Sequence, residues 1–255
     1  MRPNNEDSFL CLQFDGQEVH HLGRLGESST QRGDFVFAVS DGMGGAKAGE
    51  FASRVAVDKI TRRLPPAFRQ QAVGIDSSFD DVLTELFHDI HRALLFLGGS
   101  DEECDGMGAT LSLCWFRPGW LCFAHIGDSR IYYLPANGGP LRQLTEDDTY
   151  VGWLYRTGKI NEREARQHPA RNSLQRALGA GHQFVDPQLG AVAVESGDRF
   201  LLCTDGVIDG LFDAQIPEYL QASGGGEGSP ARSLVEAAVE RSGRDNTTAL
   251  ILEIE

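Results

Sequence analysis

The chain has 255 residues, an ordinary globular composition, and 23 basic against 37 acidic side chains, for a formal net charge of −14. This excess of acid argues against a nucleic-acid partner or an anionic membrane, because phosphate groups and acidic lipids attract Lys and Arg. It is consistent with carboxylates gathered around metal ions, and equally with an acidic surface.

The first half of the chain alternates short apolar segments with amphipathic ones. The predicted elements, in chain order, are a strand at 8–14, a polar connection at 15–34, a strand at 35–40, and helices at 46–64 and 79–97. The first helix is expected to end before Pro65-Pro66, because proline removes a helical hydrogen bond. The second has its apolar side chains along one face.

The second half is rich in strands and contains one polar insertion. The predicted elements are strands at 109–116, 120–126 and 130–134, a mostly helical insertion at 145–178, strands at 191–194 and 199–203, a helix near 213–221, a glycine-rich loop at 224–228, a helix at 230–242 and a strand at 247–254. Closely spaced strands favour antiparallel hairpins. Two groups of strands, each with a pair of helices, predict an α+β fold with two packed sheets and helices outside them.

The five cysteines include no C-x-x-C pair, and most lie in apolar runs. We therefore expect free thiols in a reducing compartment and no zinc site. No stretch approaches the ~20 apolar residues that span a bilayer. Charged residues follow Met1 directly, unlike a signal peptide, so we expect a cytoplasmic protein.

The strongest local feature is the apolar run 35–40 followed by Asp41-Gly42-Met43-Gly44-Gly45. Glycines let the backbone turn tightly and approach an ion or phosphate. The segment is no P-loop, because Lys47 is not preceded by glycine, and it contains no G-x-G-x-x-G. A single Asp-Gly pair is more often a structural turn than a site.

The same pattern recurs elsewhere in the chain. Asp205 follows another apolar run, Asp128 follows the strand that ends at Ile126, and Asp245 precedes the last strand. Four aspartates that are distant in sequence but alike in position predict one shared site. A set of ligands in which every donor atom is oxygen suits Mg²⁺ or Mn²⁺. The sequence shows no His or Cys cluster that would indicate zinc.

The N-terminus adds Arg2 and Glu6 directly before the first strand. Arginine grips phosphate through two parallel hydrogen bonds. A terminal charge cluster is usually solvated, but beside a carboxylate metal site it would suit the attack of a metal-bound hydroxide on phosphorus.

Taken together, these motifs resemble the type 2C (PPM-type) metal-dependent serine/threonine phosphatases, in a bacterial form. The matching motifs, in the family's order and across the whole chain, are Arg2-x-x-Asn5-Glu6-Asp7, Asp41-Gly-Met-Gly-Gly, Gly106-x-Gly108-Ala-Thr110, Gly127-Asp-Ser-Arg130, Leu144-Thr-Glu-Asp147, Thr204-Asp-Gly206 and Asp245-Asn-x-Thr248. The resemblance implies one phosphatase domain over 1–255. Its fold would be a four-layer α-β-β-α sandwich, with the insertion at 145–178 as a flap beside the site.

The resemblance also implies roles for single residues. Asp41 would bridge two Mn²⁺ or Mg²⁺ ions, with the Gly42 carbonyl on one of them, and Asp205 and Asp245 would hold the other. Glu6 would contact the cluster directly or through water, Asp128 would help Asp205 hold a third, weaker ion, and Arg2 would bind the phosphate. A hydroxide that bridges the metals would attack phosphorus in phosphoserine or phosphothreonine.

The chain departs from the family in two places. Met43 stands where animal members often carry a histidine that protonates the leaving alcohol, so water or another side chain must do this here. The family usually has an earlier strand leading into the position of Arg2, and a frayed terminus would position phosphate poorly.

The resemblance implies phosphorylated proteins as substrates, a serine/threonine protein kinase as a natural partner, and a monomer. Two alternatives remain open: a catalytically weak or inactive module that binds phosphoproteins, and a hydrolase of small phosphoesters.

Overall fold

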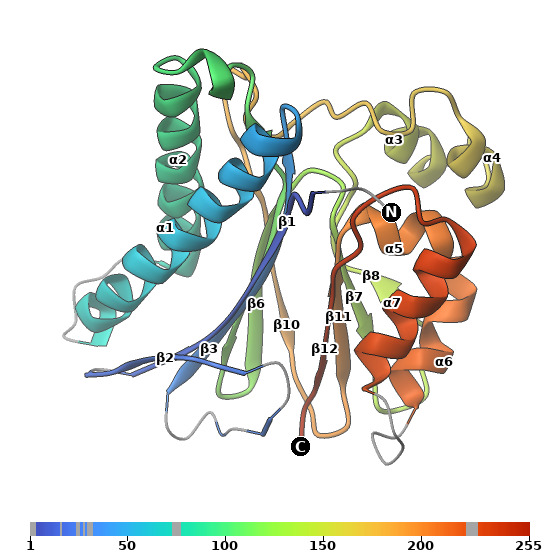
Figure 1. Cartoon of the computed structure of the whole chain (residues 1–255). Helices are drawn as coiled ribbons and strands as arrows, with labels where there is room; N and C mark the ends of the chain where they lie inside the picture. Colours follow the sequence, from blue (N-terminus) through green and yellow to red (C-terminus); the bar gives the residue numbers. More distant parts are fainter. Residues whose placement is uncertain are drawn as a thin grey trace.

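The computed structural model describes residues 4–15, 17–23, 26–27, 29, 33–72, 78–222 and 229–255. Two β-sheets pack face to face, and helices cover their outer faces (Figure 1). The four-layer α+β sandwich predicted from the sequence is confirmed.

The first sheet is antiparallel, with its main path in the order β10-β6-β5-β3-β1-β2, while β4 pairs with β3 and β9. Its strands are β1 (Asp7–Phe14), β2 (Val19–His21), β3 (Asp34–Met43), β4 (Gly108–Ala109), β5 (Leu111–Arg117), β6 (Trp120–Ile126), β9 (Leu178–Gly179) and β10 (Gln188–Ala193). The second sheet has the order β12-β11-β7-β8. Its strands are β7 (Arg130–Leu134), β8 (Arg142–Gln143), β11 (Arg199–Cys203) and β12 (Ala249–Glu253).

The helices form the two outer layers and the insertion. Helices α1 (Ala46–Ala72) and α2 (Phe79–Gly98) pack on the first sheet and contact each other. On the second sheet lie α5 (Asp205–Gly210), α6 (Ile216–Gln221) and α7 (Pro230–Arg241). The insertion contains α3 (Tyr150–Arg156) and α4 (Glu162–Gln167), and the short 3₁₀ helices are η2 (Glu102–Cys104) and η3 (Asp213–Gln215).

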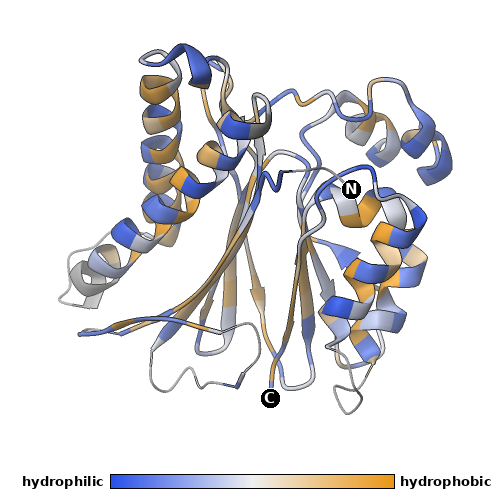
Figure 2. Ribbon diagram, in the orientation of Figure 1, coloured by the Kyte–Doolittle hydropathy of each residue, from blue (hydrophilic) through white to orange (hydrophobic). Residues whose placement is uncertain are grey.

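Three hydrophobic cores fill the spaces between the four layers, and apolar residues line the helix sides that face the sheets (Figure 2). Strand β3 serves two of these cores. Val36 and Ala38 point toward α1 and α2, whereas Phe35 and Val39 point toward the second sheet. A strand buried on both faces reads as a continuous apolar run rather than an alternating one. This explains why β3 gives the most conspicuous strand signal in the amino-acid sequence.

Several boundaries differ from the prediction. Helix α1 continues through Pro65 and Pro66 to Ala72, because Leu64, Pro65 and Ala67 pack into or against the protein interior and this offsets the lost hydrogen bonds. Strand β3 runs on to Met43, so Asp41 lies within the strand and pairs with Asp7. Strand β2 lies inside the predicted connection 15–34, and α5 was not predicted. The glycine-rich loop at 224–228 lies outside the described residues.

Strand β12 is apolar on both faces although it forms the edge of its sheet. Leu250 and Leu252 contact the core between the sheets, whereas Ala249 and Ile251 contact the core under α6 and α7. All four are half-buried, and a groove of about 1000 Å³ runs between this edge and β1. Interior strands usually have this two-sided composition, while edge strands are usually protected by charges or short length.

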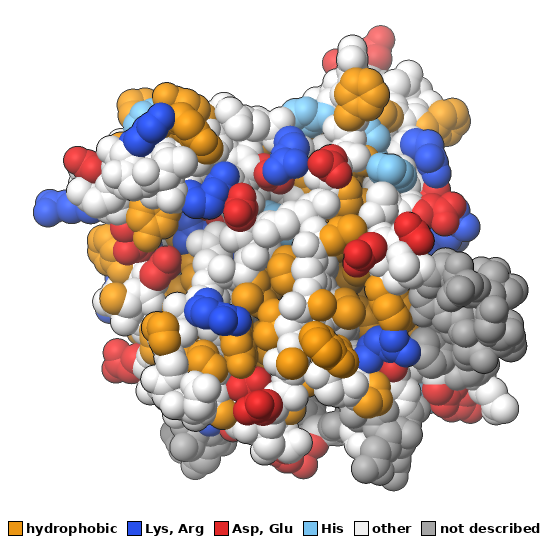
Figure 3. Space-filling view, turned by 180° about the vertical axis from the view of Figure 1, so that it is seen from behind, with side chains coloured by type: hydrophobic (Ala, Val, Ile, Leu, Met, Phe, Trp, Pro, Cys, Tyr) orange, Lys and Arg blue, Asp and Glu red, His pale blue; other side chains and the backbone are white. Residues whose placement is uncertain are grey.

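The face turned away in Figure 1 also exposes apolar side chains, mainly over its lower half (Figure 3). Trp120, at the start of β6, is 53% exposed.

No helix in the described ranges is long and apolar enough to cross a membrane. The five cysteines are free thiols, as predicted, with Cys114 and Cys203 buried and the others half-buried.

Candidate metal centre

Four aspartates from separate parts of the chain meet at one end of the sandwich. Asp41 lies near the end of β3, Asp128 in the turn between β6 and β7, Asp205 at the first position of α5, and Asp245 just before β12. Each partly reaches the surface. The antiparallel order of the sheets brings these strand ends to the same rim, which is what their shared position in the sequence predicted.

The electrostatics of the four show that they lie within reach of one another. Burial raises the pKa of Asp41 well above its ordinary value, and the charges of Asp7 and Asp128 raise it further. Burial also raises the pKa of Asp205, with added repulsion from Asp128 and Asp41. The pKa of Asp128 is raised to about 7, first by burial and then by Asp147. Ionised together, these carboxylates repel one another and therefore favour a bound cation.

Asp7, on the first position of β1, ties two of these segments together, those of Asp205 and Asp245. Its Oδ2 atom accepts hydrogen bonds from the hydroxyls of Thr204 (2.8 Å) and Thr248 (2.7 Å), and the Thr248 amide donates to the Thr204 hydroxyl (3.1 Å). Thr204 precedes Asp205, and Thr248 follows Asp245 by three residues. Burial raises the pKa of Asp7 to about 6, while the two threonine hydroxyls lower it.

Thr110 performs a similar task for Asp41. Its hydroxyl accepts the Asp41 N–H (3.0 Å) and contacts the Ser129 hydroxyl (2.7 Å), one residue after Asp128. The Thr110 N–H in turn donates to the Asp41 carbonyl (2.8 Å). The backbone that carries Asp41 is thus tied on both sides to the segment that leads toward Asp128.

Glycines allow the close approach of backbone that this geometry needs. A Cβ at Gly42 would lie 1.8 Å from the carbonyl oxygen of Gly49, at the start of α1. A Cβ at Gly49 would lie 2.6 Å from Oε2 of Glu6 and 2.8 Å from the Gly42 carbonyl oxygen. The Glu6 carboxylate and the Gly42 carbonyl therefore flank the same glycine.

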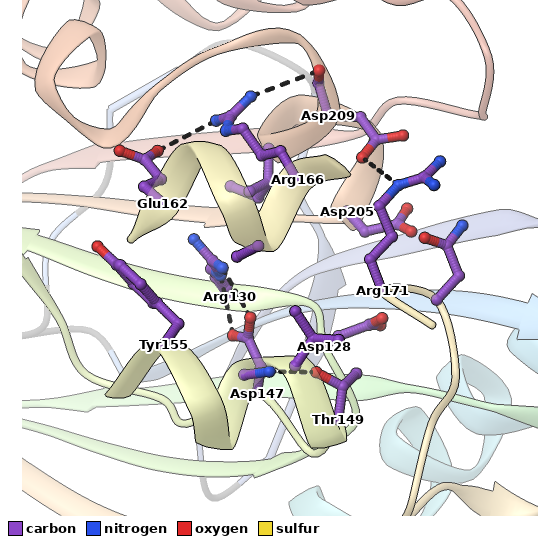
Figure 4. A pocket seen from close by; sticks show the side chains of 15 residues that line it. Asp128, Arg130, Asp147, Thr149, Tyr155, Glu162, Arg166, Arg171, Asp205 and Asp209 are labelled. Atoms are coloured by element: carbon purple, nitrogen blue, oxygen red, sulfur yellow. Dashed lines mark hydrogen bonds and ion pairs between the residues drawn. The ribbon is translucent and has the colours of Figure 1, made fainter. Parts of the chain in front are cut away.

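The insertion at 145–178 covers a cavity that Asp128 and Asp205 also line (Figure 4). Arg130 anchors its floor, donating from Nε (2.9 Å) and from a terminal nitrogen (2.6 Å) to the two oxygens of Asp147. The acidic and basic residues that line the cavity are Asp128, Asp147, Glu162, Asp205, Asp209, Arg130, Arg166 and Arg171.

His125, close to the Asp128 turn, is a structural residue. It is fully buried, its Nδ1 lies 2.8 Å from the Ser112 hydroxyl, and its Nε2 lies 3.1 Å from the Gly127 carbonyl. The carbonyl can only accept, so Nε2 carries the proton and Nδ1 accepts from Ser112. Burial lowers the pKa of His125 and keeps it neutral.

The structure places most of the predicted site residues in one region. Asp41, Gly42, Asp128, Asp205 and Asp245 meet there, and Glu6 lies within their electrostatic range. Arg2 lies outside the described residues.

Sequence reasoning gave no role to Asp7 or Asp209. Asp7 belongs to the motif Arg2-x-x-Asn5-Glu6-Asp7, and its place at the start of an apolar strand was a further signal. Asp209 lies one helical turn after Asp205, but α5 had not been predicted, so the two could not be placed on one face.

The donor chemistry of this region fits a hard divalent cation. In the described ranges no three His, Cys, Asp or Glu side chains already stand as they would around a bound metal. Ionised carboxylates repel one another without a cation, and such sites also use backbone carbonyls and water. The Oδ1 atoms of Asp7 and Asp205 are buried with no hydrogen-bond partner among the described residues. Orphaned carboxylate oxygens inside an acidic cluster are the ligands that Mg²⁺ or Mn²⁺ would take.

This fold and an oxygen-rich site of this kind define a class of metal-dependent phosphoester hydrolases. Comparison with known proteins identifies the family: residues 24–242 match the model of protein phosphatase 2C. The chain belongs to the protein phosphatase 2C family.

Two curated relatives illustrate the likeness. The chain is 35% identical over 249 residues to the serine/threonine protein phosphatase PstP of Mycobacterium tuberculosis. The aligned region covers 96% of this chain but 45% of PstP. It is 32% identical over 219 residues to the serine/threonine phosphatase stp of Listeria innocua, covering 86% of this chain and 84% of that protein. The chain thus spans less than half the length of PstP.

A solved structure extends the likeness to the overall fold. The catalytic domain of PstP in complex with two manganese ions superposes with a TM-score of 0.76 at 30% identity, covering 100% of this chain and 94% of that one. The metal-dependent class inferred from the carboxylates is therefore also the class of its relatives.

Proposed function

We propose that the chain is a protein phosphatase that hydrolyses phosphoserine and phosphothreonine on other proteins and depends on two Mn²⁺ or Mg²⁺ ions. The observation that carries this is the convergence of Asp41, Asp205 and Asp245 from three distant segments, each repelling the others. The related phosphatases named above support the choice of phosphorylated protein as substrate.

The proposed ligand roles follow the resemblance to the family. Asp41 would bridge the two ions, with the Gly42 carbonyl on one, while Asp205 and Asp245 would hold the other, and Glu6 would contribute directly or through water. Asp128 would help Asp205 hold a third ion. When bound, the ions would supply a nucleophilic hydroxide at neutral pH and neutralise charge on the phosphoryl oxygens. Arg2 would bind the phosphate.

The protein's own part in this chemistry is to hold its carboxylates in fixed positions. Thr110 fixes the backbone at Asp41, and Asp7 fixes the segments of Asp205 and Asp245 through Thr204 and Thr248. A site held rigidly before the substrate arrives needs little reorganisation during the reaction.

The insertion at 145–178 would act as a flap over the site within a single phosphatase domain of residues 1–255. We further propose a cytoplasmic monomer whose substrates are the targets of a serine/threonine protein kinase, or that kinase itself.

The decisive measurement is phosphate release from a phosphothreonine peptide in Mn²⁺, in Mg²⁺ and in EDTA. We expect EDTA to abolish turnover and Asp205→Asn to lower kcat by about 100-fold or more, because an amide is a poorer ligand than a carboxylate. The matched control is Asp80→Asn, in the exposed first turn of α2, which should leave kcat within a factor of two. Turnover that persists in EDTA would refute the metal dependence. Tight metal binding without turnover would instead favour a phosphoprotein-binding module.

A further inference from the structure

A short ladder of three strands lies at the proposed metal ligand Gly42. Its two rows, drawn from β3, β4 and β9, are Gly42–Ala109–Leu178 and Met43–Gly108–Gly179. Leu178 is also the last residue of the insertion at 145–178. The ladder therefore connects the backbone that carries the Gly42 carbonyl to the point where the insertion rejoins the sheet.

His91 of α2 holds the outer strand of this ladder. Its Nδ1 atom accepts a hydrogen bond from the Gly179 N–H (3.0 Å), and the residue is only 5% exposed. The packing here is close, because a Cβ at Gly179 would lie 2.7 Å from the Met107 carbonyl oxygen and 2.8 Å from the Cβ of Leu94. Leu94 lies one helical turn after His91, so β9 packs directly on the side of α2 that carries the histidine.

The hydrogen bond to Gly179 decides where the ring of His91 carries its proton. Because the Gly179 N–H donates, Nδ1 must supply the lone pair, and the proton of the neutral ring is on Nε2. The Nε2 atom is buried and makes no hydrogen bond to another described residue. A second proton would have to bind Nδ1, where two N–H groups would then face each other. Protonation therefore removes the acceptor that holds β9.

The charges around His91 do not favour a protonated ring. Burial lowers its pKa from 6.5, and the groups that lower it further are His182, His88 and Arg92, while the His182 backbone opposes the shift. Strands β4 and β9 carry no titratable side chain. The Asp89 carboxylate, on the same helix, is paired with Arg63 of α1 and with Arg92. Helix η2 contacts α2 and adds the exposed Glu102 and Glu103. A protonated His91 would thus be a buried cation with other cations as its main electrostatic neighbours.

We propose that His91 is a positioning residue, which fastens the end of the insertion to α2, supports the backbone at Gly42 through β4, and releases both when its ring gains a proton. The release itself is a property of the fold and needs no substrate. Its effect on turnover rests on the proposed function, because it assumes that the Gly42 carbonyl serves a metal ion. Stability from a ring that is kept neutral by burial is complete above pH 6.5 and is lost as the pH falls through the lowered pKa.

Two substitutions separate the hydrogen bond of His91 from its titration. His91→Asn places an amide oxygen that does not titrate where Nδ1 accepts from Gly179, whereas His91→Leu removes the acceptor. The measurement is amide hydrogen exchange by NMR in saturating Mg²⁺, between pH 7.5 and pH 4.5. The reporting amides are Gly179 and Ala180, whose N–H donates to the Met107 carbonyl (2.7 Å), and the amides of β5 report global unfolding.

The three proteins should differ in a way that depends on pH. At pH 7.5 we expect His91→Leu to exchange at Gly179 about tenfold faster than wild type, as for a lost buried hydrogen bond, and His91→Asn to match wild type. At the acid end, wild type should approach His91→Leu, while His91→Asn should stay protected. If His91→Leu does not fold, the comparison of wild type with His91→Asn decides alone.

Turnover provides a second readout. For a phosphothreonine peptide, the ratio of kcat/KM in His91→Asn to that in wild type should be near one at pH 7.5 and rise about threefold or more at the acid end. The carboxylates of the site titrate in both proteins, so this ratio isolates His91. The matched control is His20→Asn, exposed on β2, whose ratio to wild type should stay near one throughout.

The two readouts distinguish failure of the role of His91 from failure of the proposed function. Protection at Gly179 that falls with pH in wild type but not in His91→Asn supports the release even if no phosphopeptide is turned over, and the proposed function alone then fails. The same pH dependence of exchange in wild type and His91→Asn overturns the release. Exchange as expected with a flat kcat/KM ratio overturns the support of Gly42.

Discussion

Asp7 offers a direct test of the electrostatics of the site, because its carboxyl is buried and titrates far from its usual range. Its pKa is raised from 3.8 to about 6, mainly by burial. The native state therefore holds this proton more tightly than the unfolded chain does. Stability from this group is complete below the unfolded pKa and is lost as the pH rises through the native one.

The loss can be worked out from the two pKa values. With these two pKa values, ionisation of Asp7 lowers the free energy of unfolding at pH 7 by about 3 kcal/mol, relative to a side chain that stays neutral. At pH 4 it lowers that free energy by less than about 1 kcal/mol. Asp7→Asn removes the charge, while its amide oxygen can still accept from Thr204 and Thr248. We therefore expect metal-free Asp7→Asn to be more stable than wild type by about 2 to 3 kcal/mol at pH 7, and nearly equal at pH 4.

Urea denaturation in EDTA at pH 4, 5, 6 and 7 measures this difference. Mn²⁺ should stabilise the wild type more than the variant, because the ion neutralises the charge that the variant lacks. Parallel stability curves for the two proteins across this pH range would refute the reasoning. So would a variant that is less stable than wild type at pH 7.

Three shorter predictions concern the scaffold of the site. Gly42→Ala places a Cβ 1.8 Å from the Gly49 carbonyl, so thermal denaturation should show a loss of about 2 kcal/mol or more, with Mn²⁺-dependent activity nearly abolished. Thr110→Val leaves the Asp41 N–H without its acceptor, and we expect a loss of about 1 to 3 kcal/mol in urea and a fall in kcat of about tenfold. Arg166→Ala releases α4 from the Leu211 carbonyl, so limited proteolysis within 156–178 should accelerate while global stability changes little. Unchanged cleavage of that segment would show that Arg166 does not hold it.

The strands were predictable because burial imposes a simple pattern on them. Strands β6, β7 and β11 have the bounds that the sequence predicts, since each is a short apolar run between turn residues. Helix α1 passed its predicted end because tertiary packing of Leu64 and Ala67 outweighs the local effect of proline. Helix α5 was missed because Gly206 and Gly210 disfavour a helix locally. Its glycines are required by packing, since a Cβ at Gly210 would lie 2.3 Å from the Ala238 carbonyl.

The aspartates of the candidate site could be predicted from the sequence, whereas the residues that hold them in place could not. Asp41, Asp128 and Asp205 are visible in the sequence because each comes after an apolar run, and the ends of these runs gather at one rim. Thr110 and Thr248 are polar residues without a distinctive pattern, and only the folded chain reveals that their hydroxyls hold the segments of the aspartates. Long-range side-chain pairs of this kind join residues up to 241 positions apart, and no local signal encodes them.

The aspartates and the residues that hold them have opposite effects, and this explains how the fold keeps a cluster of mutually repelling carboxylates in place. Burial and mutual repulsion raise the pKa of Asp41 and Asp205, so the metal-free site opposes folding as the pH rises. The threonine hydroxyls act in the other direction, since those of Thr204 and Thr248 lower the pKa of Asp7. Two sheets packed over three hydrophobic cores supply the stability that offsets this strain. A divalent cation then removes the repulsion, so metal binding and stability are linked through the same carboxylates.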